Sequence, residues 1–209
     1  VEMSSVDKRI LALSIHGVDV SEIFSPERVA ATAAKFGLTA GTSFDMTNGS
    51  DFCRRDHRMK CLERLKLEKP FMVIGSPPCT KFSLLQELTI ARKWNDPAWM
   101  DRHKKQLAEA VAHIEFCCLI YRWQLKNGRH FLHEHPWGAR SWKLQCIEEL
   151  KSDGRVGLAF ANMCRFGMTT HVHGKHGPRG AVAKPIGFLS PSWIMCQELG
   201  KRCQGGHIH

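Results

Sequence analysis

Short apolar runs alternate with helical patterns along most of the chain. Residues 18–24, 71–75 and 130–134 are short and rich in Val, Ile, Leu or Phe, which is typical of buried strands. Residues 99–126 instead repeat apolar side chains at helical spacing. Because strands that alternate with helices favour a largely parallel sheet covered by helices, we expect an α/β fold.

The length of 209 residues suits one domain with a sizeable core, so we expect a single domain over residues 1–209. Ser25 and Pro26 are typical of a helix start, with Ser as the cap and Pro at the first helical position. The further predicted elements are helices at 25–37, 54–68, 141–151 and 193–199, strands at 156–161 and 186–189, and a polar hairpin or loop at 171–184.

The chain is strongly basic, with 30 Lys and Arg against 20 Asp and Glu and a formal charge of +10. Such a surplus favours a polyanion as partner, because cationic side chains beside phosphates release counterions. The alternative is a basic soluble protein, or one packed in a larger assembly. The absence of a long apolar run or a signal peptide leads us to expect neither secretion nor a membrane span.

Nine cysteines occur in an odd, irregular arrangement without a small-disulfide pattern. We therefore expect an intracellular, reducing compartment, the nucleus if the substrate is genomic DNA, with most cysteines acting as small core residues. The first residue is Val1 rather than Met, which is typical of an excised domain, a processed product or part of a polyprotein.

Three polar features follow predicted strands: the turn after Phe24, Cys79 after two prolines, and Glu134 before His135. Ligands bind at the carboxyl ends of strands in open α/β sheets, so these features are candidates for one site.

Cys79 follows Pro77 and Pro78, which restrict the backbone and hold the side chain in place. Backbone N–H groups of a following helix or turn would favour a nucleophilic thiolate. The alternative is an ordinary buried cysteine at a strand end.

Glu134 ends an apolar strand, where a carboxylate needs a partner. Burial would raise its pKa and let it donate a proton or hydrogen bond to a ring nitrogen. The alternative is a structural carboxylate paired with Arg140 or a histidine.

The segments FMVIGSPPCTKFS, around Cys79, and FLHEHP, around Glu134, resemble the nucleophile and glutamate motifs of DNA cytosine-5 methyltransferases. VSEIF, ending at Phe24, resembles the strand that leads into the family's cofactor loop, and Asp45 stands where an acidic residue closes the second strand. FANMCRFGM resembles a later strand of the family. The likeness covers most of the chain and is nearest to divergent methyltransferase-like domains of protist mobile-element polyproteins.

The resemblance implies a class I methyltransferase fold, Rossmann-like, and methyl transfer from S-adenosylmethionine to C5 of cytosine in DNA. Cys79 would add to C6 of a flipped cytosine, and Glu134 would hold the N3 edge. The residues that would line the cofactor site are Phe24, Ser25, Asp45, Asp51, Ser76 and Pro77.

The chain departs from this family at several points. Ser25, Pro26 and Glu27 replace the glycine-rich loop, and His135 replaces an asparagine. An arginine-rich segment expected after Gly167 is not visible, and there is no room for a separate target-recognition domain. Two other functions therefore stay open: a non-catalytic domain of this fold that binds nucleic acid or serves as a structural subunit, and an RNA cytosine methyltransferase.

A basic, histidine-rich stretch is predicted to contact phosphates, with a solvated loop as the alternative. The candidate nucleic-acid-binding residues are Lys81, His171, His173, Lys175 and Arg179.

Cys203, His207 and His209 are of types that suit tetrahedral zinc, with Cys164 as a fourth ligand if the last residues fold back. Their spacing matches no zinc signature, so the sequence predicts no metal site and favours an unstructured basic segment.

Overall fold

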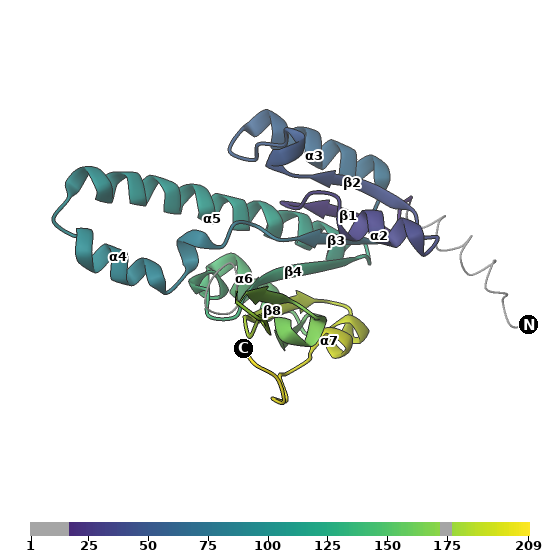
Figure 1. Cartoon of the computed structure of the whole chain (residues 1–209). Coiled ribbons are helices and arrows are strands. Elements are labelled where there is room, and N and C mark those ends of the chain that lie inside the picture. Colours follow the sequence, from purple (N-terminus) through teal and green to yellow (C-terminus); the bar gives the residue numbers. More distant parts are fainter. Residues whose placement is uncertain (1–16, 172–176) are drawn as a thin grey trace, which may run out of the picture. The chain divides into compact units, whose positions relative to one another are not determined.

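The computed structural model describes residues 17–171 and 177–209. The chain divides into two compact units. The first unit runs to Pro78 and includes Ala112–Leu132, while the second contains Cys79–Val111 and His133–His209. Two elements belong to both units, the long helix α5 (Pro97–Lys126) and the strand β4 (His130–Pro136) (Figure 1).

The first unit is built on three parallel strands in the order β2-β1-β3. Their bounds are β1 (Val20–Ile23), β2 (Ala40–Phe44) and β3 (Met72–Gly75). Ile23 pairs with Phe44 on one side and Gly75 on the other, so the three strands end at the same level. The start of β4 joins this unit, where the N–H of His130 donates to the carbonyl of Phe71 at 2.8 Å.

Helices of the first unit are α2 (Val29–Lys35), α3 (Arg55–Glu68) and the second half of α5, with the short 3₁₀ helix η1 (Met46–Asn48). Tyr121 of α5 is fully buried and stacks on Phe131, with ring centroids 4.4 Å apart. Gln124, also fully buried, donates its side-chain amide to the carbonyls of Pro70 and His130. These hydrogen bonds satisfy the side-chain N–H groups that Gln124 carries into the core of the unit.

The second unit contains the end of β4 together with β8 (Pro185–Ser190) and β5 (Gly157–Asn162). β8 is antiparallel to both neighbours, and Glu134 of β4 pairs with Phe188. Since β4 is shared, the hydrogen-bonded order of the six strands is β2-β1-β3-β4-β8-β5. The architecture is therefore α/β with a mostly parallel central sheet, compatible with a Rossmann-like fold.

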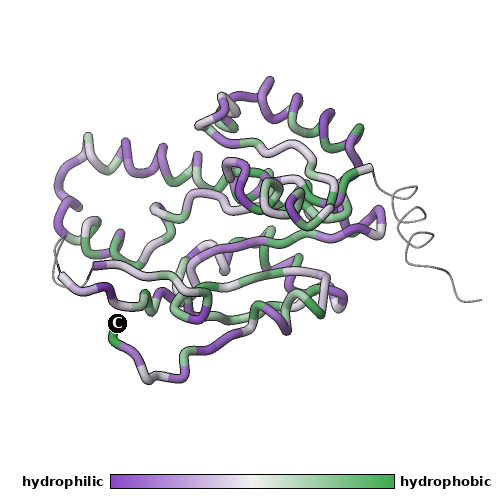
Figure 2. The backbone as a smooth tube through the Cα atoms, turned by 45° about the vertical axis from the view of Figure 1, so that its right-hand side comes forward, coloured by the Kyte–Doolittle hydropathy of each residue, from purple (hydrophilic) through white to green (hydrophobic). Residues whose placement is uncertain are grey.

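The other elements of the second unit surround these strands. They are η2 (Thr80–Phe82), α4 (Leu85–Lys93), η3 (Arg140–Lys143), α6 (Gln145–Lys151), η4 (Met163–Phe166), α7 (Trp193–Leu199), and the antiparallel strands β6 (Thr169–His171) and β7 (Arg179–Ala181). α4 and the first half of α5 form a helical hairpin (Figure 1). This half of α5 is mostly exposed and hydrophilic (Figure 2).

The predicted strands and helices are found within a few residues of their predicted bounds, and β6 and β7 confirm the strands of a hairpin. The start of α2 differs. We expected Ser25 to cap this helix, but α2 begins at Val29, and the Ser25 hydroxyl donates to the carboxylate of Glu22 at 2.8 Å. None of the helices in the two described ranges combines the length and apolarity needed to cross a membrane.

Candidate functional site

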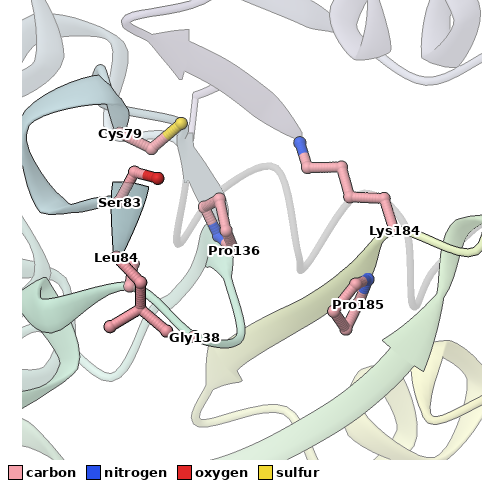
Figure 3. A pocket seen from close by; sticks show the side chains of 8 residues that line it. Cys79, Ser83, Leu84, Pro136, Gly138, Lys184 and Pro185 are labelled. Carbon is pink, nitrogen blue, oxygen red and sulfur yellow. The ribbon is translucent and has the colours of Figure 1, made fainter. Parts of the chain in front are cut away.

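A pocket of about 320 Å³ lies in the second unit, at the end of β4. This volume is at the lower end of the usual range for ligand sites. Its lining residues are Cys79, Ser83, Leu84, Pro136, Gly138, Ala139, Lys184 and Pro185. In Figure 3, the thiol of Cys79 and the amine of Lys184 point toward one another across the pocket.

Cys79 is half-buried and stands directly before η2. Its carbonyl accepts the N–H of Phe82 at 2.9 Å, which fixes the turn that presents the side chain. The thiol itself receives no capping hydrogen bond from the amides of η2. The structure thus places the predicted nucleophile in a pocket, but not with the helix-amide contact that we expected to favour its thiolate.

Glu134 does not itself line the pocket, but its position on β4 gives it the same face of the strand as a lining residue. It is two residues before Pro136, a lining residue, and residues two apart in a strand share one face. Burial raises the pKa of the Glu134 carboxyl, while the positive charge of Lys184 acts in the opposite direction. A carboxyl with a raised pKa is suited to donate a proton or a hydrogen bond.

The sequence also left open that Glu134 is a structural carboxylate paired with Arg140 or a histidine. In the structure, these candidate partners make other contacts. Arg140 forms an ion pair with Glu87 of α4. His133 and His135 alternate with Glu134 along β4 and are fully buried on its other side, where the ring of His135 is hydrogen-bonded to Ser141 at 2.6 Å. Burial lowers the pKa of His133 to about 3, so this ring is neutral at neutral pH.

Lys184 is a site residue that sequence reasoning missed. It directly precedes β8, and an antiparallel strand begins at the edge where its neighbour β4 ends. The only sequence signal is its position just before Pro185 and an apolar run. Neither feature shows the direction of the strand, which is what brings this ammonium to the pocket.

The predicted cofactor residues lie in the first unit, at the carboxyl ends of its strands. Phe24, Asp45 and Ser76 directly follow the paired residues that end β1, β2 and β3, so they stand side by side. Phe24 has a positive φ of 55°, a conformation that side chains seldom adopt, and its ring contacts Phe52 and His113. Strain of this kind is often found at functional sites.

The other three predicted residues are mainly engaged within the protein. Ser25 and Pro77 are buried, and Asp51 accepts the N–H of Cys53 at 2.9 Å. Asp45 is half-buried, and its Oδ1 accepts two hydrogen bonds from Thr47, at 2.9 and 2.7 Å.

Glu22, in β1, accepts hydrogen bonds from the backbone at the start of α2. This residue is 1% exposed, and its Oε1 accepts the N–H groups of Arg28 and Ala30, both at 2.9 Å. Ser25 bonds to the other carboxylate oxygen. The N–H groups of Arg28, which precedes α2, and of Ala30 within it are therefore satisfied by a carboxylate of the chain itself, which replaces the serine cap predicted from the sequence.

The contacts at the carboxyl ends of β1, β2 and β3 can be compared with the groups that S-adenosylmethionine would present there. Asp45 fits the ribose, because Thr47 orients its carboxylate from one side, and Phe24 offers an aromatic ring beside it. The start of α2 fits the carboxylate of the methionine arm poorly, because the Glu22 carboxylate already accepts the N–H groups of Arg28 and Ala30. The edge thus offers polar and aromatic contacts of the kind that a nucleoside takes.

The predicted nucleic-acid-binding residues that can be placed all lie in the second unit. Lys81 is in η2, and His171 and Arg179 are in β6 and β7, where Arg179 donates to Thr169 at 3.1 Å. His173 and Lys175 lie outside the described residues.

No model of a known protein family matches the chain, and a search of curated proteins finds no match either.

Proposed function

We propose that this chain transfers a methyl group from S-adenosylmethionine to C5 of cytosine in DNA. The observation that carries the proposal is the pocket of the second unit, which Cys79 lines at the end of β4 and toward which β4 turns the face carrying Glu134. A nucleophile and an acid with a raised pKa are the two groups that addition to a cytosine ring needs.

The order of the strands supports the fold that this function requires. β8 lies antiparallel between β4 and β5, which therefore run in the same direction. In class I methyltransferase domains, the last strand of the sheet likewise lies antiparallel between two strands that are parallel to each other. This similarity supports the motif likeness around Cys79 and Glu134.

In the proposed reaction, the thiol of Cys79 loses its proton to solvent, its sulfur donates an electron pair to C6 of the cytosine, and a C–S bond forms. Glu134 donates its proton, or a hydrogen bond, to N3, so that the electrons displaced from the C5–C6 double bond are stabilised. C5 would then bond to the methyl group, whose bond to the sulfonium sulfur of S-adenosylmethionine breaks, so that S-adenosylhomocysteine is the leaving group. Loss of the C5 proton to solvent breaks the C–S bond and returns the electron pair to Cys79.

S-adenosylmethionine would supply the methyl group as an electrophile. Asp45 would accept hydrogen bonds from the ribose hydroxyls, and Phe24 would contact the adenine. Both residues stand at the strand edge of the first unit. The base must leave the helical stack for a thiol to reach C6, and the formal charge of +10 favours binding to the DNA backbone.

A second candidate is a domain of this fold that binds nucleic acid without methyl transfer. Glu22 favours it, because its carboxylate occupies N–H groups at the start of α2 that a bound cofactor would otherwise meet. The half-buried Glu134 favours catalysis, since a buried carboxyl without a task costs stability.

A labelled-methyl assay separates the two candidates. The whole chain is incubated with cytosine-containing DNA and S-adenosylmethionine that carries a radioactive methyl group. We expect label in the DNA, a loss of about 10³-fold or more with Cys79→Ser because the nucleophile is gone, and a loss of about 10²-fold with Glu134→Gln.

Cys146→Ser is the matched control, because this half-buried cysteine of α6 does not line the pocket. It should transfer label at the rate of the unmodified chain. Tight DNA binding without any transfer, unchanged by Cys79→Ser, would support the binding domain instead.

A further inference from the structure

Four side chains of metal-ligating types meet at one point of the second unit. Cys164 comes from η4, and Cys203, His207 and His209 come from the segment after α7. One ligand atom from each residue lies within 4.8 Å of all the others. Cys164 is 39 positions before Cys203 in the sequence, so the fold itself brings the two sulfurs together.

The distances match those of a tetrahedral zinc site. Zn–S bonds of about 2.3 Å and Zn–N bonds of about 2.05 Å at tetrahedral angles place sulfur and nitrogen ligands about 3.6 Å apart. In the structure, the Sγ of Cys203 lies 3.6 Å from the Nε2 of His207 and 3.3 Å from the Nε2 of His209. Cys203 therefore lies at the spacing of a zinc site from both histidines, and the sulfur of Cys164 lies within 4.8 Å of the other three ligand atoms.

The surroundings orient these ligands. The Nδ1 of His209 is hydrogen-bonded to the carbonyl of Ala181 at 3.2 Å, which leaves Nε2 as the nitrogen that faces the cluster. Ligand histidines usually hold their second ring nitrogen in this way. The N–H of Gly205 donates to the Sγ of Cys203 at 3.4 Å, and Gly205 and Gly206 both have positive φ, which lets the chain turn back toward Cys203.

Residues 200–209 contain no helix or strand and are mainly hydrophilic (Figure 2). They nevertheless have fixed partners. Cys203 donates its N–H to the side chain of Asn162 at 2.8 Å, and Ile208 accepts the N–H of Ala181 at 2.8 Å. Because Ile208 and the histidines are exposed, apolar burial does not explain why this segment lies against β5 and β7.

We propose that Cys164, Cys203, His207 and His209 bind one zinc ion, which fastens residues 200–209 to η4. Four protein ligands fill a tetrahedral site, so the ion is structural and leaves no position for water or substrate. The site is separate from the pocket at Cys79 and does not depend on the proposed methyl transfer.

Metal binding to the whole chain tests this proposal directly. The chain is purified with a reductant, freed of metal and titrated with Zn²⁺ against a chromophoric chelator, and in parallel with Co²⁺. We expect about one ion per chain and a cobalt spectrum with tetrahedral bands and thiolate charge-transfer absorption. At Zn²⁺ concentrations about 100 times the dissociation constant, the ratio of folded to unfolded chain should rise about 100-fold.

Cys164→Ser and Cys203→Ser should each lower zinc affinity by at least about 10²-fold and weaken the thiolate absorption. The matched control, Cys53→Ser, should bind like the unmodified chain, and so should Cys79→Ser, which makes failure of this proposal distinct from failure of the proposed reaction. The proposal is overturned if the reduced, unmodified chain takes up no stoichiometric metal, if Cys203→Ser binds as well as Cys53→Ser, or if the sulfurs of Cys164 and Cys203 are joined in a disulfide that excludes metal even after reductant is added.

Discussion

At the scale of single residues, the environment of Glu134 combines two opposing effects. Its position on β4 withdraws the carboxylate from water, and the neighbouring Lys184 attracts the charged form. Burial has the larger effect, so the folded chain holds the proton of Glu134 to a higher pH than the unfolded chain does. The carboxyl is thus kept available as a donor at the cost of some stability.

This raised pKa makes a prediction about stability and pH. From the ordinary glutamate pKa of 4.5 up to the raised pKa of the folded chain, unfolding releases the proton of Glu134. Stability should therefore fall as pH rises through this window, and Glu134→Gln should remove that loss. The free energies of unfolding of both proteins, measured in urea from about pH 4 to about pH 8, should move apart in favour of the variant.

Glu63→Gln, on the exposed surface of α3, is the control and should follow the unmodified chain at every pH. A stability difference between the Glu134 variant and the unmodified chain that stays constant with pH, or that opens in the opposite direction, would show that burial does not dominate at this carboxyl.

At the scale of elements, the start of α2 shows how a helix can be capped by a residue outside it. Glu22 belongs to β1, yet its carboxylate accepts the amides of Arg28 and Ala30. The strand and the helix are therefore joined by buried hydrogen bonds rather than by a local cap. This arrangement fixes the turn that carries Phe24 at the strand edge.

Glu22→Ala should lower the free energy of unfolding by about 2 kcal/mol, because the N–H groups of Arg28 and Ala30 at the start of α2 lose their acceptor and that of Ala30 is buried. Urea unfolding of the variant measures the loss. Glu27→Gln, an exposed residue in the same turn, should change stability by less than about 0.5 kcal/mol. Equal stability of the two variants would mean that water replaces the carboxylate and that the turn is open to solvent.

The difference between a local cap and a cap from another element explains which helix starts could be predicted from the sequence. α7 begins at Trp193 as the sequence predicts, because its cap is local: Ser192 accepts the N–H of Met195. The cap of α2 could not be predicted, since Ser25 is the better local candidate and Glu22 reaches the helix only through the sheet. Local sequence signals were therefore sufficient to predict the start of α7, but not the start of α2.

At the scale of the whole molecule, short motifs predicted some of the residues that the structure places at one pocket, but not all of them. Cys79 and Glu134 were predicted from short segments, and the structure places one in the lining of a pocket and the other on the face of β4 that also carries a lining residue. Lys184 could not be predicted, because its place depends on the antiparallel direction of β8. Cys164 and Cys203 match no zinc spacing, because the fold and not the sequence interval brings them together.

The central claim is that Cys79 forms a covalent bond with a cytosine. DNA that contains 5-fluorocytosine tests it most directly, because fluorine at C5 cannot leave as a proton and the C–S bond therefore persists. With S-adenosylmethionine present, the whole chain and Cys146→Ser should each give a protein–DNA complex that survives denaturing electrophoresis, and Cys79→Ser should give none. A complex that persists in Cys79→Ser, or no complex with the unmodified chain once DNA and S-adenosylmethionine are bound, would contradict the proposed chemistry.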